Sequence, residues 1–353
     1  MSERRVIILC NSAYQLLTAI QLRLTIYKQD HVDVLVSNQM SRSCEIADNL
    51  KQISLFNSVR HIDTNRRDYR NRFFETLHDL ALIHRLHRES GDFDVFCTAN
   101  ISVFSILFVR FYQKRRLEVN IYEDGMVTYC RCFEHFDRAG IVARLLLPHG
   151  VLGQTKHIYI FNPELLEWHV KGVTPIAIPK IDSDNHETVK MLNQAFGYDN
   201  SAAEYDRPYL FMEESFYADG YPVPDVELVE RIGSAVGKNN VMIKLHPRNG
   251  VDRFSRLGYK VSSNSAIPWE LILLNQSMQD KTLLSISSSS LLQPYLLLGQ
   301  EVKSIALLNL LSEKPGNMSG ELGNFMLALF ERLSPICITP HTEQELYELL
   351  REK

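Results

Sequence analysis

Two polar residues at the end of a short apolar run have the types and spacing of a phosphate site. Lys244 and His246 are two positions apart, so they lie on the same side of an extended backbone, and Pro247 ends the run. We expect a buried strand at 241–245 with His246 at its carboxyl edge, where open α/β sheets bind ligands. A lysine and a histidine there favour phosphate. This composition often yields a His-Pro pair by chance, so the surroundings decide its meaning.

A second cluster, Glu123-Asp124-Gly125, follows an expected strand at 117–122. Two neighbouring carboxylates push one pKa upwards, which suits a general base, and Gly125 permits a tight turn beneath them. A solvated acidic turn explains these residues equally well.

Polar residues also follow two further expected strands. Asn11 and Ser12 come after the strand at 5–10, and Asn100 follows the strand at 93–98. Asn11 and Ser12 are foremost a helix cap, but the unpaired amides at that helix start would also favour an anion or sugar hydroxyls. We therefore count these three residues among the candidates for lining a binding cleft at this sheet edge.

A serine cluster opens the expected helix at 290–298 after a strand at 282–286. Short hydroxyls and unpaired helix amides make a cradle for a phosphate or carboxylate, although an N-cap alone also accounts for them. The candidate ligands are Ser287, Ser288 and Ser289. Glu270 lies in the first turn of another expected helix, where it would accept hydrogen bonds from a ribose diol or merely complement the helix dipole.

These clusters require elements that place them at sheet edges, and strand-like and helix-like patterns do alternate along the chain. Such alternation predicts an α/β fold with mostly parallel sheets. We expect an N-terminal domain at 1–171 and a C-terminal domain at 172–340, with the helix at 341–353 a candidate for packing back on the first domain. The remaining expected strands are 32–36, 59–62, 157–161, 209–212, 260–261 and 303–307, and the helices are 12–22, 43–53, 73–87, 103–112, 226–236, 268–275 and 342–351.

Composition excludes several classes of protein. The net charge of −4 and the absence of a basic stripe argue against nucleic-acid binding. Six cysteines without CxxC spacing indicate neither a disulfide framework nor a zinc site, and Asp-x-Asp spellings fall at the wrong places for a metal. No run approaches the roughly 20 apolar residues of a membrane span. We expect a cytoplasmic protein with at most peripheral inner-membrane contact, for which the basic segment 66–72 is a candidate.

In this order the motifs acid-acid-Gly, His-Pro and Ser-Ser resemble those of bacterial sialyltransferases and polysialyltransferases. The opening Cys10-Asn-Ser-Ala-Tyr-Gln-Leu-Leu-Thr is most similar to glycosyltransferase family 52, and the resemblance covers residues 5–299. It implies a GT-B fold, with two Rossmann-like domains facing each other across a cleft. It further implies CMP-activated sialic acid as donor, inversion at the anomeric centre, and no metal or other cofactor.

The resemblance also implies roles for individual residues. Asp124 would be the general base on the acceptor hydroxyl, with Glu123 as its neighbour. Some family members place the base in the loop that here contains Glu214, so Glu214 competes for that role.

On the donor side, the resemblance implies that His246 hydrogen-bonds or protonates the departing phosphate and that Lys244 neutralises it. Pro247 would lie against the cytosine and Glu270 would hold the ribose hydroxyls. The serines at 287–289 would bind the phosphate and the sialyl carboxylate.

The expected function is transfer of sialic acid to a galactose or sialic acid hydroxyl of a bacterial lipooligosaccharide, O-antigen or capsule. One alternative is the same fold acting on another nucleotide sugar. Another is a non-catalytic sugar-nucleotide-binding protein of capsule assembly. Acceptor, linkage, processivity and oligomeric state, a dimer included, are left open by the sequence.

Overall fold

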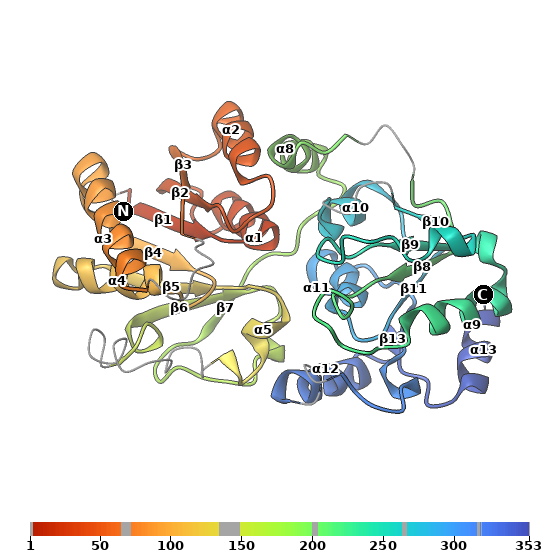
Figure 1. The fold of residues 1–353 in the computed structure, drawn as a ribbon. Helices are drawn as coiled ribbons and strands as arrows, with labels where there is room; N and C mark the ends of the chain where they lie inside the picture. Colours follow the sequence, from red (N-terminus) through yellow and green to blue (C-terminus); the bar gives the residue numbers. More distant parts are fainter. Residues whose placement is uncertain are drawn as a thin grey trace. The chain divides into compact units, whose positions relative to one another are not determined.

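The computed structural model describes residues 3–64, 72–133, 149–199, 204–262, 267–315, 318 and 320–352. Most of the basic segment 66–72 lies outside them. The chain divides into two compact units, the first comprising Met1–Ile181 with Lys190–Gly197 and the second Asp182–Val189 with Tyr198–Lys353. Each unit contains one parallel sheet (Figure 1).

The first unit contains a seven-stranded parallel sheet in the order β3-β2-β1-β4-β5-β6-β7. Its central strands are rich in branched apolar residues and buried, as expected for a sheet covered on both faces. The strands are β1 (Arg5–Cys10), β2 (His31–Ser37), β3 (Ser58–Ile62), β4 (Val95–Thr98), β5 (Glu118–Tyr122), β6 (Thr155–Ile160) and β7 (Pro175–Ala177).

Helices of the first unit begin where the sequence supplies caps. The Ser12 hydroxyl accepts a hydrogen bond from the Gln15 amide at the start of α1, and Ser102 caps α4 in the same way. The α-helices are α1 (Ala13–Leu24), α2 (Ser43–Ile53), α3 (Arg72–Ser90), α4 (Val103–Tyr112) and α5 (Met126–Tyr129), and short 3-10 turns lie at Gln113–Arg115, Leu152–Gln154 and Pro163–Leu165.

The second unit contains a six-stranded parallel sheet in the order β10-β9-β8-β11-β12-β13. Thus β8 lies between β9 and β11. The strands are β8 (Tyr209–Met212), β9 (Val241–Lys244), β10 (Lys260–Val261), β11 (Thr282–Ser285), β12 (Ser304–Ala306) and β13 (Cys337–Ile338). The α-helices are α9 (Asp225–Val236), α10 (Trp269–Asn275), α11 (Gln293–Leu298), α12 (Glu321–Arg332) and α13 (Glu343–Arg351), with 3-10 turns at Lys238–Asn240, Ser255–Leu257, Ser289–Leu291 and Leu308–Leu310.

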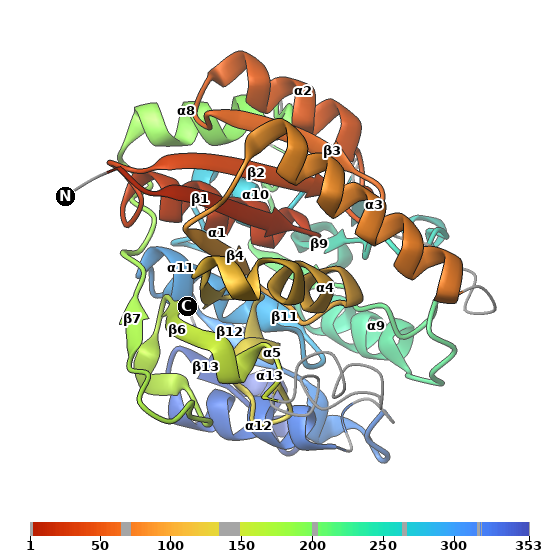
Figure 2. The same ribbon diagram turned by 90° about the vertical axis from the view of Figure 1, so that its left-hand side faces the viewer.

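The division between the units differs from the predicted boundary at 171/172. Residues 175–177, which that boundary assigns to the C-terminal domain, form β7 beside β6 in the first sheet. Helix α8 (His186–Phe196) begins in the second unit and ends in the first, where Asn49 of α2 donates to the Ala195 carbonyl at 3.4 Å. Figures 1 and 2 show α2 and α8 side by side.

The C-terminal helix, a candidate for packing back on the first domain, is part of the second unit. Helix α13 belongs to the second unit and lies beside α9 (Figure 1). The Tyr209 hydroxyl donates to the Leu350 carbonyl at 2.6 Å, and the Lys303 ammonium donates to the Leu349 carbonyl at 2.7 Å. Both contacts join the helix to strands of the second sheet or the loop before them.

Among the described residues, no helix is long and apolar enough to cross a membrane.

Candidate active site

Glu123 lies directly after β5, at the carboxyl edge of the first sheet, and is fully buried. Its carboxylate accepts hydrogen bonds from the hydroxyls of Tyr14 and Tyr129 and, at 2.8 Å, from the Phe161 amide. Burial raises the pKa of Glu123 to about 7, although these donors oppose the shift. The contacts hold the loop after β5 against α1 and α5, so Glu123 acts as the anchor of this edge.

Asp124 follows as the second carboxylate of the pair and is only partly buried. Burial raises its pKa to about 6, and a hydrogen bond with the Gln15 side chain opposes that rise. The Asp124 amide donates to the Thr128 hydroxyl at 2.7 Å, and Gly125 follows at φ +70°, a value that glycine adopts without strain. A carboxylate with this pKa is ionised at neutral pH and basic enough to accept a proton.

Gln15 connects the predicted polar residues of this edge. Its side-chain oxygen accepts from the Asn11 amide at 2.7 Å, while its side chain also contacts Asp124. The Asn11 side-chain amide donates to the Asn100 carboxamide oxygen at 3.1 Å. Asn11, Asn100 and Asp124 are therefore brought together, with Ser12 beside them as the cap of α1.

Sequence reasoning did not single out Gln15, Tyr14 or Tyr129. Gln15 is 1% exposed although it is polar, and it directly precedes the apolar pair Leu16-Leu17 on α1. A polar residue at a core-facing helix position next to a predicted sheet edge was the available signal. The motif at 10–18 contains Tyr14, but no local pattern links either tyrosine to Glu123, because their hydroxyls meet it only in the folded chain.

In the second unit, Lys244 ends β9 and His246 follows within the loop. Lys244 is 8% exposed, and burial lowers its pKa, with the Glu270 carboxylate opposing the shift. Burial, together with the charges of Arg248 and Lys244, lowers the pKa of His246 to about 4. His246 is therefore neutral at pH 7.

The His246 ring has a defined tautomer. Its Nδ1 accepts a hydrogen bond from the Arg248 amide at 3.2 Å, so the proton of the neutral ring resides on Nε2. The amide of His246 itself donates to Glu213 Oε2 at 2.9 Å. Pro247, which lies between His246 and Arg248 in the sequence, is exposed. The loop therefore presents an N–H donor from the ring beside a buried lysine.

The serine loop after β11 is organised around Glu214. One carboxylate oxygen accepts from the Ser287 amide at 2.6 Å and from the Ser285 hydroxyl at 3.0 Å, and the other accepts from the Ser287 hydroxyl at 2.8 Å. Burial raises the pKa of Glu214, and these donors oppose the rise. Both donors of Ser287 are directed at Glu214 in this structure.

The adjacent serines form the predicted cap. The Ser288 hydroxyl accepts from the Ser290 amide at 3.2 Å at the start of a 3-10 turn that includes Ser289. Glu270, 8% exposed in the first turn of α10, accepts from the Gln293 side chain at 2.7 Å. Burial raises the pKa of Glu270, and the nearby Lys244 charge opposes the rise. The donor-side candidates thus share the carboxyl edge of the second sheet.

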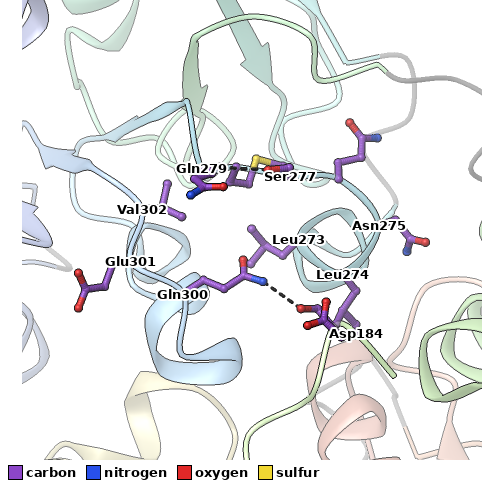
Figure 3. Close-up of a pocket in the computed structure, with 12 residues that line it drawn as sticks. Asp184, Leu273, Leu274, Asn275, Ser277, Gln279, Gln300, Glu301 and Val302 are labelled. Carbon is purple, nitrogen blue, oxygen red and sulfur yellow. Dashed lines mark hydrogen bonds between the residues drawn. The ribbon is translucent and has the colours of Figure 1, made fainter. Parts of the chain in front are cut away.

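A cavity of about 460 Å³ lies elsewhere in the second unit (Figure 3). Gln300, Glu301 and Val302 line it just before β12, and Leu273 lines it from α10. Gln300 donates to the Ser183 hydroxyl at 3.1 Å on its wall. The cavity is at the amino edge of β12, opposite to the edge that carries His246, and none of the predicted site residues lines it. Among the described residues no group of three or more His, Cys, Asp or Glu could hold a metal ion.

Solved structures with the same architecture show the fold to be GT-B. The glycotransferase of kitacinnamycin has a TM-score of 0.56 and 11% identity, covering 100% of this chain and 92% of that one. UDP-GlcNAc 2-epimerase from Methanocaldococcus jannaschii has a TM-score of 0.59 and 11% identity, covering 99% and 93%. LpCGTa in complex with UDP has a TM-score of 0.59 and 11% identity, covering 99% and 91%. At such identity these structures establish the fold alone.

Sequence comparison supplies the family. A search of curated proteins returns no match. A family model described as alpha-2,8-polysialyltransferase (POLYST) matches residues 6–307, from β1 to the end of β12. This match confirms the resemblance to sialyltransferases in general, whereas the narrower likeness to family 52 stays a prediction. With nearly the whole chain covered, including both candidate edges, the protein belongs to the alpha-2,8-polysialyltransferase family.

Proposed function

We propose that this protein is an inverting, metal-independent sialyltransferase that transfers sialic acid from CMP-Neu5Ac to a hydroxyl of a bacterial surface glycan, such as lipooligosaccharide, O-antigen or capsule. Membership of the polysialyltransferase family carries the proposal. The family's description favours a terminal sialic acid as acceptor, joined by an α2,8 linkage, over galactose. Further support comes from Lys244, His246 and Glu270 on one sheet edge.

In the proposed reaction Asp124 is the general base. Its carboxylate, with a pKa raised to about 6, takes the proton of the acceptor hydroxyl as that oxygen attacks C2 of the sialic acid. Glu214 is less suited, because Ser285 and Ser287 already donate hydrogen bonds to its carboxylate. Asn11 and Asn100 then contribute polar contacts to the acceptor.

The C2–O bond to CMP breaks as the new bond forms, and its electron pair leaves with the phosphate. Lys244 and the Nε2–H of His246 stabilise that charge, and the hydroxyls of Ser288 and Ser289 add to it. Glu270 accepts hydrogen bonds from the ribose, and the exposed Pro247 lies against the cytosine. Attack opposite to the departing phosphate gives inversion.

A glycan array with CMP-Neu5Ac as donor tests the proposal. We expect sialic acid on sialylated acceptors and stoichiometric CMP release. Transfer from a UDP-sugar instead would show the same fold acting on another donor. CMP binding without any CMP release on an array of sialylated and galactose-terminated glycans would indicate a non-catalytic binding protein.

The proposal also includes three properties of the protein: it needs no metal, it is located in the cytoplasm, and it contacts the membrane at most peripherally. Lys244 and His246 carry the positive charge and hydrogen-bond donor that a single phosphate leaving group requires. Turnover should therefore persist in excess EDTA. Loss of turnover, restored by a divalent ion, would contradict this part.

A further inference from the structure

A buried ion-pair cluster lies behind the His-Pro loop. The Arg253 guanidinium donates to Glu213 Oε1 at 2.7 Å and to Asp225 Oδ1 at 2.9 Å. The two carboxylate side chains are 0% and 5% exposed, and Arg253 itself is 18% exposed. Arg253 also lies over the Tyr217 ring, 4.7 Å from its centroid. The guanidinium is thus held from several sides.

Glu213 bridges this cluster to the candidate site. While Oε1 pairs with Arg253, Oε2 accepts the His246 amide at 2.9 Å. The amide of Glu213 donates to the Lys244 carbonyl at 3.0 Å. The residue after β8 therefore fixes the backbone on both sides of residue 245. The same carboxylate is paired with the Arg253 guanidinium, so the ion pair fixes the position from which Glu213 holds this backbone.

The His246 ring depends on the same stretch of backbone. Its Nδ1 accepts the Arg248 amide, and the Asn249 amide donates to the His246 carbonyl at 3.0 Å. The direction of Nε2–H is thus set by the path of residues 246–249, which begins at the peptide that Glu213 holds.

A buried ion pair contributes little net stability, because the cost of removing both charges from water offsets their attraction. The cluster at Glu213 nevertheless places two buried carboxylates and one arginine next to the proposed leaving-group residue. What such a cluster supplies is a fixed position for the groups that it binds.

We propose that Arg253 and Glu213 are positioning residues for His246: Arg253 holds Glu213, and Glu213 holds the His246 peptide so that Nε2–H points to the donor phosphate. The phosphate part rests on the proposed function, whereas the orientation of the ring does not.

The test compares Arg253→Gln with Arg231→Gln, a matched control in the same unit. Arg231 pairs with Glu343 of α13 at the surface, and both side chains are more than 40% exposed. Histidine-ring ¹⁵N NMR at pH 7, with the His246 signal assigned from a His246→Ala spectrum, reports the tautomer without any ligand. Calorimetry then gives the dissociation constant of CMP.

We expect wild type and Arg231→Gln to show the Nε2–H tautomer alone. Arg253→Gln should show mixed tautomers and about tenfold or more weaker CMP binding, because misplaced groups lose their aligned contacts. Arg253→Lys, which keeps one charge, should lie between them. If Arg253→Gln does not fold, the variant Glu213→Gln is used in its place. In that variant Arg253 is still paired with Asp225, so its guanidinium is not left without a carboxylate partner.

A folded Arg253→Gln with a lower melting temperature but an unchanged His246 tautomer would overturn the proposal, since its role would be structural only. Mixed tautomers in a protein whose wild type does not bind CMP would support the positioning role while refuting the CMP donor. The two failures are therefore distinguishable.

Discussion

At the scale of single residues, Glu123 and Asp124 show how neighbours in sequence acquire different roles. Both follow β5. Two tyrosine hydroxyls and a backbone amide donate hydrogen bonds to the Glu123 carboxylate. The Asp124 carboxylate forms a hydrogen bond with the Gln15 side chain, which opposes the rise of its pKa. The anchored carboxylate holds the edge, and the other keeps oxygen lone pairs available for a substrate proton.

Replacing the proposed base separates it from its competitor. Asp124→Asn should lower kcat by roughly 10²–10⁴-fold and leave the CMP dissociation constant unchanged, because the general base is lost while the donor loops stay intact. Glu214→Gln should instead weaken CMP binding, because one of the two oxygens that accept hydrogen bonds from the serine loop becomes an amide donor. The opposite pattern, with kcat lost only in Glu214→Gln, would transfer the base role to Glu214.

The pH dependence of the reaction follows from Asp124. Its pKa is raised to about 6, and the base must be ionised, so kcat/KM should be constant above pH 7 and fall as pH decreases through about 6. The wild-type profile should show this acidic limb with CMP-Neu5Ac and a sialylated acceptor. A value of kcat/KM that stays constant down to pH 4.5 would exclude Asp124, with this pKa, as the base.

His246 carries the prediction for the leaving group. Its ring is neutral with the proton on Nε2, so His246→Ala removes a donor to the phosphate. CMP should bind roughly 10–100-fold more weakly, the loss typical of a hydrogen bond to a charged group. The exposed His341, before α13, gives the control His341→Ala, which should bind CMP like wild type. Equal affinities in both variants would contradict the phosphate role.

At the scale of elements, the parallel strands and capped helices follow from local sequence. Arg5–Cys10, Ser43–Ile53 and Val103–Tyr112 were predicted with the boundaries that the structure has, because apolar runs and caps such as Ser102 are short-range signals. The two-residue β13 and the helix α12 were not predicted. β13 spans two residues and carries no periodicity of its own, although the equally short β10 was among the predicted strands.

The candidate site was predictable only in part, for a related reason. Residues that follow a strand within two positions, such as Asp124 and His246, can be found because strand ends converge at one edge. Arg253 reaches Glu213 across 40 positions of the chain, and no spacing rule connects them. Likewise, the contact between Glu214 and the serine loop joins residues 73 apart. Residues at the strand ends of a site can thus be recognised from local sequence, whereas the residues that hold them in place depend on strand order.

Helix α13 provides a test at this scale. Leu346 is 1% exposed on the face that α13 turns to its unit, so Leu346→Ala should lower the free energy of unfolding by roughly 2–4 kcal/mol. The exposed Gln344 on the same helix gives the control Gln344→Ala, expected within about 0.5 kcal/mol of wild type. Urea denaturation measures both. Equal values would mean that α13 adds no packing to the second unit.

At the scale of the whole molecule, the two units divide the proposed chemistry, with the base on the first sheet edge and the leaving-group residues on the second. Hydrogen exchange can test that division. CMP should slow exchange at residues 245–250 and 286–291, which contain the candidate donor loops, and UDP should not. Residues 275–281, at the cavity of Figure 3, serve as the reference and should exchange at the same rate with either nucleotide.

Protection by both nucleotides would indicate a donor site that does not distinguish pyrimidines, as in the alternative donor proposal. Protection by CMP confined to residues 275–281 would move the nucleotide to the other edge of the sheet.

The position of β8 between β9 and β11 has a practical consequence for changing donor choice. Two consecutive glutamates follow β8, and each binds the loop after a different neighbouring strand. Glu213 accepts a hydrogen bond from the His-Pro loop after β9, and Glu214 accepts hydrogen bonds from the serine loop after β11. If either loop is exchanged for that of a relative to change nucleotide preference, the new loop must keep its hydrogen bond to Glu213 or Glu214. Insertions at residues 213–214 would disturb both loops at once.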